Sequence, residues 1–284
     1  MKTLIKFSQF SLLVLLVAGC SSAPKKTAPV EDDHAGKVEL ETMPPVPSKT
    51  SNADAVATPV NSKSANSSAL SEAIRSGSDE SIYRVASSML MQNANDVKAL
   101  NAMGLFHNRK GRPLAARLFF SKALSIQPDN SELHSNMGLT YLANQEQTAA
   151  IRAFRKAIEL NPADISATTN LGSIYMENRD FSKAFSVLSL NTGRSKDIKF
   201  LNNFAIACAW KGKVEQAESL YQEALKLSPN NREILFNYAV FQIDYQAKFK
   251  EGLETLDHLK LIGLVESMKN TTKDLEIRAK AGLK

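Results

Sequence analysis

The chain has 284 residues, of which 35 are basic and 29 acidic, so its formal net charge is +6. The basic residues are interleaved with acidic ones, and this pattern lacks the basic patch or stripe typical of nucleic-acid binding. The two cysteines and the scattered histidines show no metal-ligand spacing, and no catalytic motif is present. We therefore expect no nucleic-acid partner, no metal, no cofactor and no enzymatic activity.

The first nineteen residues have the pattern of an export signal. Lys2 and Lys6 flank the start of an apolar stretch, and its core, Leu12–Ala18, is too short to span a bilayer of about 30 Å. The stretch ends in Leu16-Val17-Ala18-Gly19-Cys20, which resembles the lipobox of bacterial lipoproteins. The resemblance implies that residues 1–19 are removed and that Cys20 is lipidated, with two or more acyl chains giving a stable anchor. An ordinary signal peptide with an accidental cysteine is the alternative.

Ser21 bears on the destination of the exported chain. In enterobacterial lipoproteins, which the N-terminus resembles, an aspartate after the cysteine retains the protein in the inner membrane. The serine here favours the outer membrane, with the folded part facing the periplasm.

Residues 20–66 are expected to form a disordered linker behind the lipidated cysteine. From Ser21 to Asn66 there is no aromatic residue, and six of the ten prolines of the chain lie there. Such a segment buries too little apolar surface to offset the entropy lost on ordering. After it, Ala69–Arg75 and Asp79–Gln92 predict two helices, a degenerate N-terminal helix pair within residues 67–96.

An internal repeat follows. Gly104, Gly138 and Gly172, and then Ala205 and Ala239 in the same slot, recur at intervals of 34, 34, 33 and 34 residues. Alanines recur twelve residues after the first four of these positions, at Ala116, Ala150, Ala184 and Ala217. Prolines recur twenty-four residues after three of them, at Pro128, Pro162 and Pro229. A fixed period of this length indicates a stacked-repeat protein.

The pattern resembles the tetratricopeptide repeat, a pair of antiparallel helices A and B. In the second repeat, the residues that carry the resemblance are Met137-Gly138, Tyr141, Ala150, Phe154 and Pro162. The resemblance implies an all-α, right-handed solenoid of helix pairs. The five expected repeats are 97–130, 131–164, 165–198, 198–231 and 232–264, followed by a capping helix within residues 265–284.

Each column of the repeat has a packing reason. Small residues such as Gly104 and Ala116 let helices A and B of one repeat cross closely, and bulky residues such as Phe120 fill the space against the next repeat. Proline ends helix B because it lacks a backbone donor. The third and fifth repeats have no such proline, so we expect helix B to be shorter or shifted there.

The resemblance also implies that helix A of each repeat lines the inner face, where a ligand binds. Asparagine recurs near the sixth repeat position, and its amide both donates and accepts hydrogen bonds. The candidate groove residues are Lys98, Asn101, Arg109, Asn136, Asn170, Lys199, Asn202, Asn203, Trp210, Phe236 and Asn237. Two alternatives remain open: the asparagines could bond only between neighbouring repeats, and the charged and aromatic candidates Lys98, Arg109, Lys199, Trp210 and Phe236 could be solvated surface or packing between repeats.

Across nearly its full length the chain resembles outer-membrane lipoproteins built of these repeats, of the TadD and type IV pilotin type that assemble pili. This implies a lipid-anchored scaffold that binds proteins, among them secretin or pilus assembly components of a tight-adherence (Flp) or type IV pilus. The alternative is an adaptor that recruits peptidoglycan hydrolases or other cell-wall enzymes.

Overall fold

The computed structural model describes residues 62–284. The expected signal segment, Cys20 and the linker up to residue 61 lie outside the described residues. The described residues form thirteen α-helices: α1 (Ser62–Ser76), α2 (Asp79–Gln92), α3 (Val97–Arg109), α4 (Pro113–Ile126), α5 (Ser131–Ala143), α6 (Gln147–Leu160), α7 (Ile165–Glu177), α8 (Phe181–Leu188), α9 (Ile198–Trp210), α10 (Val214–Leu227), α11 (Arg232–Val240), α12 (Phe249–Ile262) and α13 (Glu266–Gly282).

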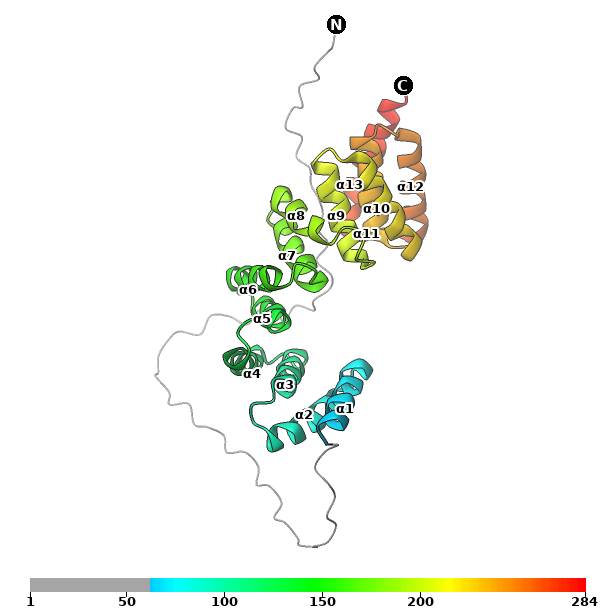
Figure 1. Ribbon diagram of the computed structural model, residues 1–284. Coiled ribbons are helices and arrows are strands. Elements are labelled where there is room, and N and C mark those ends of the chain that lie inside the picture. The colour runs from blue at the N-terminus through cyan, green and yellow to red at the C-terminus, as the bar shows by residue number, and fades with distance from the viewer. Residues whose placement is uncertain (1–61) are drawn as a thin grey trace, which may run out of the picture.

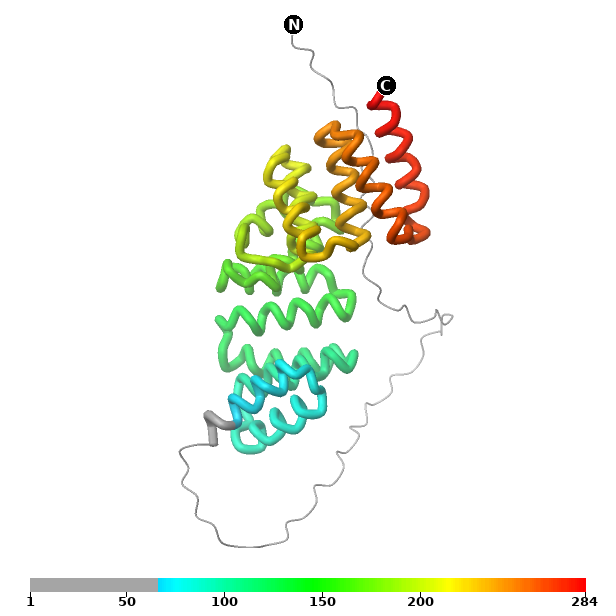
Figure 2. Tube along the Cα trace, turned by 90° about the vertical axis from the view of Figure 1, so that its right-hand side faces the viewer, coloured from blue at the N-terminus to red at the C-terminus, as the bar shows by residue number. Residues whose placement is uncertain are grey.

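The helices stack as antiparallel pairs in chain order (Figure 1). Figure 2 shows the same stack after a quarter turn, with α1 at one end and α13 at the other. Consecutive A helices, from α3 through α5, α7 and α9 to α11, contact one another and form a continuous layer. The described residues contain no strand. The expected all-α helical-repeat solenoid is therefore confirmed.

Helix α1 corrects the expected end of the linker. It begins at Ser62, whereas the linker was expected to continue to residue 66 and the helix to start at Ala69. Leu70 and Ala73 of α1 are buried against α2 and α3. Once those turns are held by packing, adding turns towards the N-terminus costs little, because helix propagation is far easier than nucleation.

A close contact between helices A and B occurs in the first three repeats. A Cβ atom added to Gly104 would lie 2.5 Å from Cε1 of Phe120, and one added to Gly138 would lie 2.6 Å from Cε1 of Phe154. In the third repeat, Leu188 fills the same place against Gly172. The missing side chain on helix A therefore makes room for a bulky one on helix B of the same repeat.

Phe120 shows that this contact also joins repeats. Its side chain is fully buried and belongs to one core cluster with Leu133 and Met137 of the next repeat. From the sequence, we expect bulky residues such as Phe120 to fill only the space against the next repeat. The structure adds that the same ring fills the gap over the glycine of its own repeat.

The third repeat has the shortened helix B that the sequence predicts. Helix α8 has 8 residues, whereas α4, α6 and α10 have 14 each. A 3₁₀ turn, Ser189–Asn191, follows it. The buried Asn191 donates hydrogen bonds to the carbonyl of Pro162, at 3.1 Å, and to Oγ1 of Thr168, at 3.1 Å. These bonds tie the chain after α8 to α7 and to the turn that precedes it.

The fifth repeat departs differently. Its helix B, α12, has 14 residues, so of the two expected outcomes, a shorter or a shifted helix, it is not shortened. Instead, α11 continues into a π-helical turn, Phe241–Tyr245, which accommodates one extra residue. Gly252 accordingly lies thirteen residues after Ala239 instead of twelve. A Cβ atom at Gly252 would lie 2.4 Å from Cγ1 of Ile243 in that turn, so the small-against-large contact persists with shifted partners.

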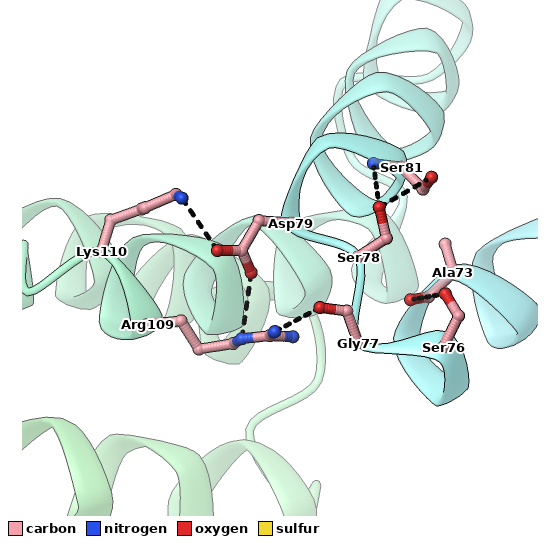
Figure 3. Close-up of polar contacts among 8 residues, drawn as sticks. All are labelled: Ala73, Ser76, Gly77, Ser78, Asp79, Ser81, Arg109 and Lys110. Atoms are coloured by element: carbon pink, nitrogen blue, oxygen red, sulfur yellow. Dashed lines mark hydrogen bonds and ion pairs between the residues drawn. The ribbon is translucent and has the colours of Figure 1, made fainter.

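Polar contacts hold the additional helices at the two ends. At the N-terminal end, Arg109 Nε lies 3.0 Å from Asp79 Oδ1 and Lys110 Nζ lies 2.8 Å from Asp79 Oδ2, and Arg109 also donates to the carbonyl of Gly77 (Figure 3). At the C-terminal end, α13 packs through Leu275 on the core, and Arg278 pairs with Asp244 at 2.7 Å. The α13 helix covers the last repeat as a solenoid requires.

Replacing Gly138 by Ala should destabilise the solenoid, because the new methyl group collides with the ring of Phe154. Overpacking of this kind costs about 1–3 kcal/mol, which should lower the midpoint of denaturant-induced unfolding. Ala143→Ser, at an exposed position of the same helix, is the control and should change little. An unchanged midpoint for the Gly138 variant would contradict the close contact.

Acidification should loosen the N-terminal helix pair. The hydrogen bond from Lys110 and the nearby Arg109 charge lower the pKa of Asp79 below its usual 3.8. A carboxylate with a depressed pKa stabilises the fold above its unfolded-state pKa and loses this contribution as the pH falls through the folded-state pKa. We expect residues 62–92 to lose hydrogen-exchange protection below about pH 4, relative to intrinsic exchange rates. Asp79→Asn should remove this dependence; an equal acid-induced loss in both proteins would exclude Asp79 as the cause.

Candidate functional site

The inner layer of A helices carries a chain of side-chain amides at its N-terminal end. Asn136 on α5 donates from Nδ2 to Oδ1 of Asn101 on α3, at 2.8 Å. Asn101 in turn donates from Nδ2 to Oε1 of Glu132, at 2.7 Å. With Lys98, these residues form what we call the N-terminal cluster. Its asparagines are half-buried and Glu132 is exposed, so the cluster borders solvent.

The same arrangement recurs between α9 and α11. Asn237 donates from Nδ2 to Oδ1 of Asn202 at 3.1 Å, and Asn202 donates from Nδ2 to Oε1 of Glu233 at 3.0 Å. With Lys199, these residues form the C-terminal cluster. Here both asparagines are buried. Burial raises the pKa of the Glu233 carboxyl, against the opposing effects of the Lys199 charge and the Asn202 hydrogen bond.

Two further asparagines of the column behave differently from each other. Asn203 is 3 % exposed and donates to Oγ of Ser173 on α7, at 3.0 Å. Within residues 62–284, no donor bonds its amide oxygen. Asn170 instead donates to the carbonyl of Ser166 in its own helix, at 2.8 Å. Most of the column therefore joins neighbouring repeats, as one of the two sequence-based alternatives expects, and Asn203 retains a free acceptor.

A hollow of about 400 Å³ lies at the C-terminal cluster. Its lining includes three of the expected groove residues, Lys199, Asn202 and Asn203, together with Glu177, Asp197 and Glu233. The side chain of Asp197 caps the N-terminus of α9 by accepting from the backbone N–H of Phe200, at 2.8 Å. The hollow thus combines one cation, three carboxylates and neutral amides, which suits hydrogen bonding to a polar ligand.

Four of the expected groove residues, Lys98, Arg109, Trp210 and Phe236, do not line this hollow. Lys98 donates to Oγ of Ser67 at 3.1 Å, and Arg109 pairs with Asp79, so both cations contact the N-terminal helix pair. Trp210 is 46 % exposed at the end of α9, with its ring 5.9 Å from that of Phe181. Phe236 is 1 % exposed and packs in the core with α12 and α13, which agrees with the packing alternative for this residue and not with a groove position.

Two glutamates that end the amide chains, Glu132 and Glu233, are not among the groove residues expected from the sequence. Glu132 and Glu233 occupy the second position of their repeats, and they lie 101 residues apart, as do Lys98 and Lys199. This spacing was available in the sequence and would have identified them. A second hollow of about 610 Å³, between α2, α3 and α4, was also missed. It is lined mainly by apolar and aromatic side chains, including Tyr83, Phe106 and Phe119.

Three further observations concern metal binding, the cysteine and membrane spanning in the described residues. No three metal-ligating side chains come together between residues 62 and 284. Cys208 is fully buried, and burial raises its pKa to about 12, so it is a small core residue, as the sequence predicts. No helix in this range has both the length and the apolar character needed to cross a membrane.

Family comparison agrees with the stacked pairs. Models of the tetratricopeptide repeat match residues 97–130, 131–164 and 198–231. These are the repeats in which the glycine or alanine, aromatic and proline columns are most complete. The described chain therefore carries tetratricopeptide repeats in a helical solenoid, a class of protein that generally binds other proteins. No curated protein matches the sequence.

Solved structures share this fold at low sequence identity. YrrB, described as a tetratricopeptide-repeat protein with an unusual peptide-binding site, is similar with a TM-score of 0.57 and 17 % identity over 66 % of this chain and 97 % of YrrB. PilF of Pseudomonas aeruginosa has a TM-score of 0.50 and 16 % identity over 66 % of this chain and 90 % of PilF. MamA of Desulfovibrio magneticus RS-1 has a TM-score of 0.51 and 16 % identity over 58 % of this chain and 94 % of MamA. At these identities the likeness shows the fold alone.

Asn136→Ala should lower stability more than Asn170→Ala. The first substitution removes a hydrogen bond between repeats, worth about 0.5–1.5 kcal/mol, while the second removes only a bond within α7. The gain in helix propensity from Asn to Ala is common to both variants. Denaturant-induced unfolding followed by circular dichroism measures the difference, and equal midpoints would contradict a structural role for the amide chain.

Proposed function

We propose that this chain is a lipid-anchored periplasmic scaffold that binds protein segments on its inner face and takes part in assembling a pilus or a secretin-based secretion machine. The observation that carries the binding role is the hollow at the C-terminal cluster, where Asn203 presents an unused amide oxygen beside Lys199 and Glu233. An extended peptide has unpaired backbone N–H and C=O groups that such side chains can satisfy.

Fold similarity to YrrB supports the peptide-binding part of the proposal, because YrrB is itself described as having a peptide-binding site. The pilus part rests on a different ground. It follows from the lipobox-like sequence at Cys20 together with the repeats, a combination that resembles pilus assembly lipoproteins. Attachment through Cys20 and a linker of residues 20–61 would place the solenoid on the periplasmic side of the outer membrane.

The second candidate function is an adaptor for peptidoglycan hydrolases or other cell-wall enzymes. The inner face also suits this role, because the polar clusters could hold a segment of an enzyme as well as one of a secretin. Affinity purification of the full chain from crosslinked, detergent-solubilised envelope, followed by mass spectrometry, separates the two. Secretin or pilus components as the main partners support the leading proposal. Cell-wall hydrolases would replace it with the adaptor, and recovery of neither class would contradict both.

Replacing Cys20 by Ala should release the protein from the membrane. Without the cysteine there is no site for the acyl chains that provide stable anchoring, and the variant should move from the outer-membrane fraction to the soluble fraction. Immunoblotting of separated envelope fractions measures this. The matched control is Cys208→Ala, which alters the other cysteine of the chain and should leave fractionation unchanged. A Cys20 variant that still sediments with outer membrane after a high-salt wash would refute the anchor.

A further inference from the structure

The N-terminal and C-terminal clusters are two copies of one arrangement. Lys98, Asn101, Glu132 and Asn136 each have an identical residue 101 positions later, at Lys199, Asn202, Glu233 and Asn237. The offset equals three repeat periods of 34, 34 and 33 residues. The hydrogen bonds repeat as well, since in both clusters one asparagine donates to the next and that one donates to the glutamate.

Stacking of the A helices does not require this arrangement. The intervening third repeat carries Ser166 at the position of the lysines and glutamates, and its Asn170 bonds within its own helix. Helix α7 nevertheless contacts both α5 and α9, just as the other consecutive A helices contact one another. A role limited to joining repeats therefore does not account for the recurrence of all four residue types after three repeats.

Each glutamate keeps binding capacity. One carboxylate oxygen accepts from an asparagine, which fixes the group in place, and neither Glu132 nor Glu233 forms an ion pair with a residue in the range 62–284. Lys98 donates instead to Ser67, and Lys199 remains exposed beside the hollow. At the C-terminal cluster the acidic groups outnumber the basic one, because Glu177 and Asp197 also line the hollow. Each cluster thus holds an anchored carboxylate on the inner face, exposed at Glu132 and half-buried in the lining of the hollow at Glu233.

We propose that the inner face binds one extended polypeptide segment at two equivalent points, with a basic side chain of the partner on Glu132 and another on Glu233. This inference rests on the proposed function, since it specifies the segment that the solenoid would hold. Beside Glu233, Asn203 lines the hollow and its amide oxygen accepts no hydrogen bond within residues 62–284, so it can accept one from a backbone N–H of the partner.

The spacing of the clusters limits the partner. Three steps between neighbouring A helices, at about 8–10 Å each, separate the two points by about 24–30 Å. An extended chain advances about 3.3 Å per residue, so the two basic residues should lie about seven to nine positions apart. Segments with a single basic residue, or with two adjacent ones, can occupy only one point.

Selection of peptides from a random sixteen-residue library displayed on phage, with the purified full chain as bait, tests the arrangement. We expect recovered peptides to carry two lysines or arginines at this spacing. Affinity of one such synthetic peptide should fall at least about fivefold in Glu132→Gln and in Glu233→Gln, because a charge-assisted hydrogen bond becomes a neutral one. The losses should multiply in the double variant, since distant sites act independently.

Glutamine can still accept the hydrogen bond from the neighbouring asparagine, so melting temperatures should be unchanged in these variants. Glu251→Gln, at an exposed position on helix B of the fifth repeat, is the matched control and should leave affinity unchanged. If the peptide's affinity falls in only one of the two glutamate variants, two-point binding is wrong. If the recovered peptides are acidic or neutral, the proposal that the partner segment is basic is wrong. Failure to enrich any peptide would contradict the peptide-binding function itself.

Discussion

The contact between a small residue on helix A and a bulky one on helix B sets the packing of the first three repeats, on which the rest of the solenoid stacks. At Gly104 and Gly138 the absence of a side chain lets an aromatic ring of helix B lie almost against the backbone of helix A. Because protein interiors are packed to near-crystalline density, this contact sets the distance between the two helices. Phe120 also contacts the next repeat, so the same ring that closes one pair positions its neighbour.

The two irregular repeats show how the contact survives changes in the sequence. In the third, Leu188 replaces the aromatic ring, and the shortened α8 is completed by the buried hydrogen bonds of Asn191. In the fifth, a π-helical turn absorbs one extra residue, and the roles are reversed, with Ile243 of that turn packed against Gly252 of helix B. Both adjustments leave the layer of A helices continuous, and that layer is the candidate binding surface.

On this surface, structural and binding roles fall on the same side chains. The asparagines at 101, 136, 202 and 237 connect repeats through one amide hydrogen, so their substitution alters stability together with any ligand contact. The charged residues beside them are different, because Glu132 and Lys199 are exposed and Glu233, although half-buried, forms no ion pair within residues 62–284. Specificity for a partner can therefore reside in the charges while the amides maintain the shape of the surface.

The sequence by itself determined the helix pairs, the repeat period and the shortened helix of the third repeat. These features depend on local spacing, on the residues that start or end a helix, and on the small residues where two helices cross. The export signal and the lipid anchor at Cys20 still rest on sequence alone. Tertiary structure decided which candidate residues share a surface. Phe236 is buried and Arg109 pairs with Asp79, although both fit the repeat positions of a groove. Partners such as Asn101 and Glu132, or Asn101 and Asn136, lie 31 and 35 residues apart. Only the stacking of one repeat on the next brings such side chains together.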